Sequence, residues 1–168
     1  MSARAATGRS TLAPVVVAAL SALAVAMLGG LITDLGNWYY GLRQPPWKPP
    51  DWLFGPAWTL IFALAAAAGV TAWHAIESRA QRQWLLVLFA LNGFLNVLWS
   101  LMFFRLQRPD WAQFEVAFLW LSIAVLIAFV GRHSRRAAWL LMPYLAWVSF
   151  AAVVNGAVVS LNAPFGGG

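Results

Sequence analysis

The fold is decided by the uninterrupted apolar stretch from Gln83 to Phe104, which reads QWLLVLFALNGFLNVLWSLMFF. No charged side chain occurs in it. At 1.5 Å of rise per residue, an α-helix of this length spans roughly 33 Å, which is enough to cross a hydrocarbon core of about 30 Å. The stretch also lacks the alternation of polar and apolar residues that a membrane β-strand requires. It therefore predicts a transmembrane helix.

Four further stretches of similar length lie around this one. Trp52 to Ile76 and Trp111 to Gly131 contain one acidic or histidine side chain each, and Ser10 to Thr33 and Ala137 to Asn162 contain no acidic, basic or histidine side chain. The first stretch is longer than the apolar core of a secretory signal peptide, so we interpret it as a membrane helix. Short connections make consecutive helices antiparallel neighbours. The sequence thus predicts a single domain over residues 1–168, an all-α integral membrane protein forming a compact bundle of five transmembrane helices, at about residues 12–33, 53–76, 83–104, 111–131 and 137–161.

The composition supports a lipid environment and excludes several classes of protein. Hydrophobic residues make up 62% of the chain and charged residues only 10%, whereas a soluble domain carries roughly 25% charged residues. The net charge of +6 comes from basic residues in the short gaps between apolar stretches, as expected for loops that meet anionic lipid head groups. We therefore expect the lipid bilayer, and not nucleic acid, as the partner. The chain has no cysteine, which excludes disulfides and thiolate chemistry.

Basic residues are distributed unequally between the two sides of the predicted bundle. The N-terminal side, with the second and fourth connections, holds Arg4, Arg9, Arg79, Arg82, Arg132, Arg135 and Arg136, and the opposite side holds Arg43, Lys48, Arg105 and Arg108. Cytoplasmic loops carry the excess of Lys and Arg. We therefore expect a multi-pass protein of a bacterial cell membrane whose N-terminus is cytoplasmic.

The longest connection runs from Asp34 to Asp51 and contains four prolines, which stiffen it. Asp51 and Asp110 are predicted to cap the helices that follow them. Aromatic side chains flank the prolines together with two cations; they are Trp38, Tyr39, Tyr40, Trp47 and Trp52, with Arg43 and Lys48. Two interpretations are open: an interfacial aromatic belt, or a lid with flat walls for a planar ligand and cations for its carboxylates.

Few polar side chains lie inside the predicted helices. Asn92 and Asn96 share one helical face, which Trp99 and Phe103 continue. The two amides either bond neighbouring helices or form a polar fixture in a cavity. Glu115 lies about 7 Å below the membrane interface by helical rise, either snorkelling to the surface or serving a pocket. No set of nucleophile, base and acid and no metal-ligand spacing is present, so we expect no metal and no obligatory cofactor.

Three segments carry a resemblance to a known family. They are WYYGLRQPPWKPP at 38–50 with AWTL at 57–60, LNVLWSLMFF at 95–104, and WLLMPYLAW at 139–147 with Asn155. In this order they resemble the first loop and the second, third and fifth helices of the TspO/MBR family of tryptophan-rich sensory proteins and translocator proteins. Each segment is weak by itself, but three in the right order are specific.

The resemblance implies a five-helix bundle, a homodimer, and a pocket below the first loop that binds porphyrins, haem or synthetic benzodiazepine-site drugs as ligands. It also leaves the outer membrane as an alternative location. The pocket residues it implies are Trp38, Tyr39, Pro49, Trp58, Phe62, Asn96, Trp99 and Trp147. Arg43 or Lys48 would meet propionates at the mouth.

An alternative activity follows from the same resemblance. In some bacterial members, tryptophans that match Trp38 and Trp147 are linked to light-dependent porphyrin degradation, which would make the chain an enzyme with these two residues as catalytic groups. Sterol binding is not expected by the motif known from animal members, because Asn155 to Ser160 lacks the tyrosine and the basic residue of that motif.

Overall fold

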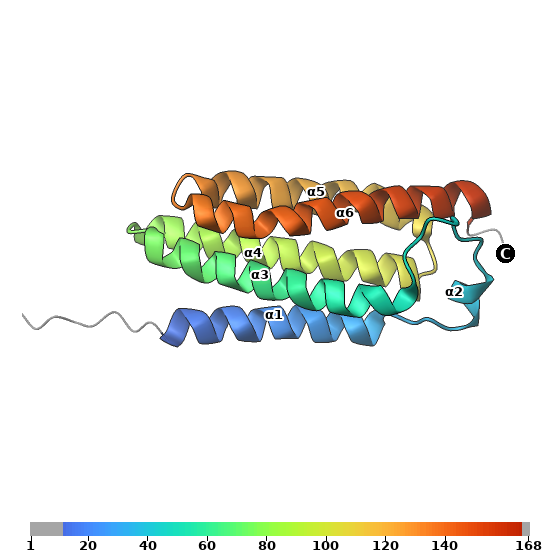
Figure 1. The fold of residues 1–168 in the computed structure, drawn as a ribbon, viewed down its shortest axis with the longest axis horizontal. Helices are drawn as coiled ribbons and strands as arrows, with labels where there is room; N and C mark the ends of the chain where they lie inside the picture. Colours follow the sequence, from blue (N-terminus) through green and yellow to red (C-terminus); the bar gives the residue numbers. More distant parts are fainter. Residues whose placement is uncertain (1–11, 166–168) are drawn as a thin grey trace, which may run out of the picture.

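Five long helices lie side by side in the computed structural model, which describes residues 12–165 (Figure 1). They are α1 (Leu12–Ile32), α3 (Phe54–Ala75), α4 (Arg79–Ser100), α5 (Pro109–Gly131) and α6 (Arg135–Asn162). Each is long and apolar enough to cross a membrane. The prediction of an all-helical bundle with five membrane spans is therefore confirmed. Arg4 and Arg9 lie outside the described residues.

Three short elements were not predicted. A helix of five residues, α2 (Asn37–Gly41), interrupts the first connection, and a 3-10 turn, η1 (Asp51–Leu53), leads into α3. The last part of the third apolar stretch forms a π-helical turn, η2 (Leu101–Arg105). In addition, α4 begins at Arg79 rather than near residue 83. Hydropathy identifies only the part of a helix that lies in lipid, so its charged first turn was missed.

The central part of the bundle is formed by α3, α4, α5 and α6, and α1 lies on its outside. α1 packs against α3, α4 and η2, and none of its residues from Leu12 to Ile32 is buried. Figure 1 shows it as the outermost of the long helices, beside α3 and α4. α1 therefore acts as an outer wall rather than as part of the core.

The predicted helix caps at Asp51 and Asp110 are wrong. The residues that precede α3 and α5 are Leu53 and Arg108, and neither makes a side-chain capping bond. Asp51 pairs with Lys48, and Asp110 pairs with Arg108. Asp51 lies inside the 3-10 turn before α3, and Asp110 is the second residue of α5, so neither occupies an N-cap position.

The first connection is tied across the end of the bundle by Asn162, the last residue of α6. The backbone N–H of Arg43 donates to Asn162 Oδ1 at 2.8 Å, and Asn162 Nδ2 donates to the Arg43 carbonyl at 2.9 Å. Arg105 also donates to the Leu31 carbonyl at 3.1 Å, near the end of α1. These bonds hold the loop over one end of the helices, above the cavity described next.

Candidate ligand-binding cavity

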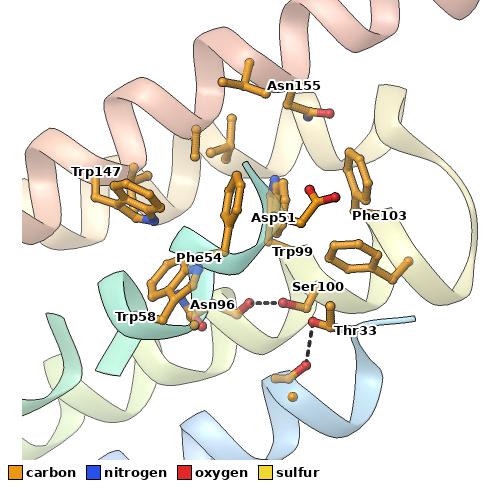
Figure 2. Close-up of a pocket in the computed structure, with 18 of the residues that line it drawn as sticks. Thr33, Asp51, Phe54, Trp58, Asn96, Trp99, Ser100, Phe103, Trp147 and Asn155 are labelled. Atoms are coloured by element: carbon orange, nitrogen blue, oxygen red, sulfur yellow. Dashed lines mark hydrogen bonds between the residues drawn. The ribbon is translucent and has the colours of Figure 1, made fainter. Parts of the chain in front are cut away.

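A cavity of about 470 Å³ lies below the first connection, between α1, α3, α4 and α6 (Figure 2). Its lining includes eight aromatic side chains, namely Tyr39, Phe54, Trp58, Phe62, Trp99, Phe103, Phe104 and Trp147. Pockets for small organic ligands are typically 300–1,000 Å³ and lined mainly by apolar and aromatic groups. The cavity therefore has the size and lining of a binding site for an apolar, ring-containing molecule.

Two stacked aromatic pairs form flat parts of the wall. Trp58 and Phe62 on α3 have ring centroids 5.2 Å apart with an interplanar angle of 26°. Trp99 on α4 and Phe103 in η2 are 5.1 Å apart at 22°. Each pair has a spacing of four residues, so both members project from the same side of their helix. The sequence period of the helices thus produces flat aromatic faces.

Several polar atoms in the cavity wall have no hydrogen-bond partner within residues 12–165. These atoms are Gln44 Nε2, Trp99 Nε1, Trp147 Nε1 and Asn155 Oδ1. Asn155 is only 2% exposed, and its Nδ2 donates to the Pro109 carbonyl at 3.1 Å. A buried polar atom without a partner typically costs about 1–3 kcal/mol. These atoms are covered by protein, so they mark places where the packing of the cavity wall leaves polar groups unsatisfied.

The two buried amides of α4 both bond to neighbouring helices. Asn96 Nδ2 donates to the Tyr144 hydroxyl at 3.1 Å, and Asn92 Nδ2 donates to Ser122 Oγ at 2.9 Å. Asn96 also lines the cavity, whereas Asn92 is not among the lining residues. Asn96 therefore fits both of the interpretations left open by the sequence, and Asn92 fits the interhelical one.

Glu115 does not snorkel to the surface. The residue is only 4% exposed, and neither of its carboxylate oxygens has a hydrogen-bond partner within residues 12–165. It is not among the residues that line the cavity either. The carboxylate is oriented into the packed interior because α5 presents this face to the other helices, together with Val116 and Leu119.

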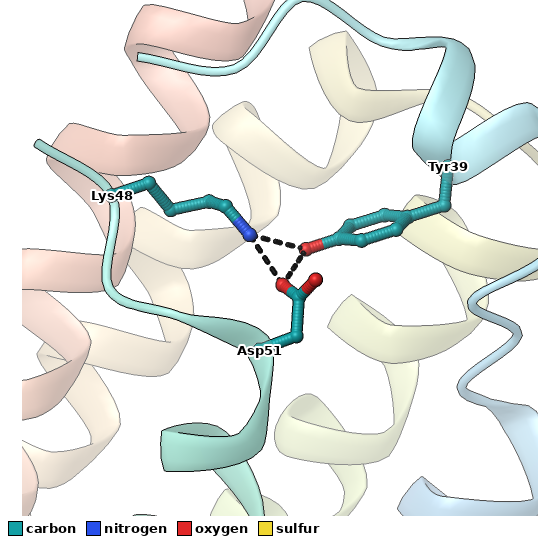
Figure 3. Close-up of polar contacts among 3 residues, drawn as sticks. All are labelled: Tyr39, Lys48 and Asp51. Carbon is teal, nitrogen blue, oxygen red and sulfur yellow. Dashed lines mark hydrogen bonds and ion pairs between the residues drawn. The ribbon is translucent and has the colours of Figure 1, made fainter. Parts of the chain in front are cut away.

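A polar cluster of Tyr39, Lys48 and Asp51 closes the cavity at its aqueous end (Figure 3). The Tyr39 hydroxyl donates to Asp51 Oδ1 at 2.7 Å, Lys48 Nζ donates to the Tyr39 hydroxyl at 2.9 Å, and Lys48 forms an ion pair with Asp51. Burial raises the pKa of the Tyr39 phenol, which is therefore neutral. Burial lowers the pKa of Lys48, but its bonds to Asp51 and Tyr39 outweigh this effect, and the pKa lies above its ordinary value. Lys48 is therefore a cation at neutral pH.

Most of the site residues named from the sequence lie together. The cavity is lined by Tyr39, Lys48, Trp58, Phe62, Asn96, Trp99 and Trp147. Trp38, Arg43 and Pro49 are not among its lining residues. Trp38 packs edge-on against Phe103, with ring centroids 5.9 Å apart, and Arg43 is exposed. A ligand-binding role for these three residues stays a prediction.

Sequence reasoning missed the contribution of α1. Ala26, Gly29, Gly30 and Thr33 line one side of the cavity, although the first helix took no part in the resemblance. The only signal for this was the Gly29–Gly30 pair, because two adjacent glycines are unusual near the end of an otherwise apolar helix. Phe54 and Phe104 were also missed, since their position depends on the loop and on η2.

Fold and cavity together define a polytopic helical membrane protein with an internal, aromatic-lined cavity of ligand size. The chain belongs to the TspO/MBR family, whose model matches residues 16–161. It is 40% identical to the tryptophan-rich protein TspO of Chlorobaculum tepidum over 83% of this chain and 90% of the relative. It is 37% identical to TspO of Archaeoglobus fulgidus, over 86% and 94%, and 30% identical to the human translocator protein, over 79% of each chain.

Proposed function

We propose that the protein is a membrane receptor or carrier that binds porphyrins and similar planar hydrophobic molecules in this cavity, as a tetrapyrrole-linked sensor or transporter. The observation that carries the proposal is the pair of flat aromatic walls, Trp58 with Phe62 and Trp99 with Phe103. Stacking against such faces favours a flat conjugated ring over a flexible chain. Relatives named translocator protein support a carrier role.

The cluster of Tyr39, Lys48 and Asp51, which we call the closing cluster, offers a cation to the polar groups of such a ligand. Lys48 lines the cavity and is a cation, and its side chain is only 12% exposed. A propionate group could replace Asp51 as its partner, because a carboxylate bound to a partly buried cation makes a strong charge-assisted bond. A planar molecule with carboxylates at one edge therefore matches both the aromatic walls and the cation at the mouth.

The proposal is tested by titrating the purified protein with protoporphyrin IX and following the quenching of tryptophan fluorescence. Trp58→Ala removes one stacked wall and should weaken binding by about tenfold, since aromatic pairs contribute about 0.5–1.5 kcal/mol beyond buried area. Trp139→Ala is the matched control, because Trp139 is 72% exposed and lies outside the cavity. Equal affinity of the two variants would contradict the proposal.

Light-driven porphyrin degradation is the second candidate function. It is favoured by Trp147, which lines the cavity with an unpartnered Nε1, but Trp38 is not among the lining residues, so the geometry supports binding better. Porphyrin absorbance under illumination, at matched occupancy, distinguishes the two functions. Loss of the decay in Trp147→Phe with binding retained would establish the enzyme, since phenylalanine is much harder to oxidise than tryptophan.

A further inference from the structure

The cavity reaches the outer surface of the bundle between α1 and α3. Four of its lining residues are exposed there, Gly30 and Thr33 at the end of α1 and Gly55 and Thr59 at the start of α3. A residue that both lines a cavity and is exposed marks a place where the cavity is open. Because these helices are membrane spans, the deeper part of this opening faces lipid. We call these four residues the α1–α3 seam.

The seam is open because no side chain fills it. A Cβ atom built on Gly30 or Gly55 meets no atom within 4 Å. Where helices pack closely, the result differs: a Cβ on Gly93 would lie 3.0 Å from Val25 of α1, and one on Gly69 would lie 3.5 Å from Phe89. α1 is thus in close contact with α4 about one turn below Gly29, and the space widens toward the end of α1.

The aqueous end, in contrast, is crossed by polar bonds. Tyr39, Lys48 and Asp51 are bonded to one another over the cavity, and the loop is fixed to α6 through Arg43 and Asn162. Passage through this end requires breaking an ion pair and several hydrogen bonds. Among the described residues, no side-chain hydrogen bond joins the two sides of the seam, because the Thr33 hydroxyl donates to the Gly29 carbonyl and the Thr59 hydroxyl donates to the Gly55 carbonyl.

We propose that the α1–α3 seam is a lateral portal, through which a planar amphiphile passes between the bilayer and the cavity. The portal lies at the depth where such a molecule resides. Gly30 is two residues from the end of α1, about 3 Å by helical rise, and Gly55 is in the first turn of α3. Both positions are near the boundary of head groups and acyl chains, where amphiphiles with an apolar body and a charged edge concentrate.

A second observation points to a ligand that comes in from this side. Asn155 on α6 lies across the cavity from Thr33, the residue that follows α1 (Figure 2). Its Oδ1 is buried and has no partner within residues 12–165. A molecule that passes the seam would therefore reach the wall that holds this residue. This inference rests on the proposed binding function. It adds that the ligand is dissolved in the membrane before it binds and that it enters the cavity through the seam.

The test measures rates as well as affinity, with protoporphyrin IX as the probe and the protein in lipid nanodiscs. Gly30→Leu and Gly55→Leu place a side chain in the seam, and Gly30→Ala gives a smaller, graded change. Gly41→Leu is the matched control, because a Cβ on Gly41 also meets no atom within 4 Å but Gly41 does not line the cavity. Stopped-flow fluorescence gives the association and dissociation rate constants.

We expect both rate constants to fall together by about tenfold in the two leucine variants, with the Kd changed by less than about threefold, because a narrowed route slows both directions equally. The rate constants of Gly30→Ala should lie between those of wild type and Gly30→Leu. Those of Gly41→Leu should equal those of wild type. Asn162→Ala, which frees the loop from α6 at the aqueous end, should leave the association rate constant unchanged.

Two outcomes would overturn the portal while leaving the proposed function standing. One is faster association in Asn162→Ala with unchanged rates in the seam variants, which would place the route at the aqueous end. The other is a raised Kd in Gly30→Leu caused by faster dissociation, which would place Gly30 in the binding site itself. If wild type does not bind protoporphyrin IX at all, the proposed function fails and the portal with it.

Discussion

Asn96 combines two roles that can be separated by mutation. It lines the cavity and also donates to the buried hydroxyl of Tyr144. Asn96→Ala should therefore weaken protoporphyrin binding several-fold and also lower the Tm, since a neutral hydrogen bond contributes about 1 kcal/mol net. Fluorescence titration and thermal unfolding in detergent measure the two effects.

Asn92 is the control for this prediction, because it makes an equivalent bond to Ser122 but does not line the cavity. Asn92→Ala should lower the Tm by a similar amount with affinity intact. If Asn96→Ala behaves in the same way as Asn92→Ala, the amide is structural only and plays no part in binding.

Glu115 is expected to cost stability rather than to provide it. Its carboxylate is buried without a partner within the described residues, and burying an unpaired charge or an unsatisfied polar group is unfavourable. Glu115→Gln keeps the shape and removes the charge, so it should raise the Tm by about 2–4 °C at pH 8, as expected for roughly 1 kcal/mol in a chain of this size. A lower Tm would show that the carboxylate has a stabilising partner.

Among the elements, the first connection depends on a residue far away in the chain. Asn162 accepts from the Arg43 N–H and donates to the Arg43 carbonyl. Asn162→Ala should release this part of the loop, so that its backbone amides exchange with deuterium faster, by about tenfold per 1.4 kcal/mol of lost protection. Ser160→Ala is the control, because the Ser160 hydroxyl bonds only within α6. Unchanged exchange in Asn162→Ala would show that the prolines alone hold the loop.

The contribution of Lys48 in the closing cluster to the stability of the protein depends on pH in a defined way. The pKa of Lys48 is raised in the folded protein, so its contribution to stability is complete below the ordinary pKa of 10.5 and is lost only as pH rises through the higher folded value. The difference in Tm between wild type and Lys48→Met should therefore be the same at pH 6 and pH 9. A difference that shrinks between these two values would mean that Lys48 loses its proton within this range.

For the whole molecule, the distribution of arginines predicts a cytoplasmic N-terminus. Because the natural chain has no cysteine, single cysteines report the topology without interference. Ser78 and Gly41 are exposed, uncharged, and lie in connections at opposite ends of the bundle. Gly41→Cys should react with an impermeant thiol reagent in intact cells, and Ser78→Cys should react only after lysis. The reverse pattern would invert the topology.

The five spans could be predicted because hydropathy and length are properties of each segment alone. Helical period likewise places Trp99 on one face with Asn92 and Asn96, whereas Trp58 and Phe62 were implied by the family resemblance. The partner of Asp51 could not be predicted, because a local capping pattern does not show that Lys48 and Tyr39 compete for the carboxylate. The bond between Asn162 and Arg43 depends on how distant segments meet in space, which no local pattern in the sequence encodes.

α1 buries none of its residues from Leu12 to Ile32, yet it forms one wall of the cavity. Its sequence is therefore constrained by the need to stay in lipid more than by the need to fit a core. Mutations there change the dimensions of the cavity at little cost in folding, so this helix is where natural variation and protein engineering have the most freedom. A set of chains that differ only in α1 would form a ready series of cavities with graded dimensions on one common scaffold.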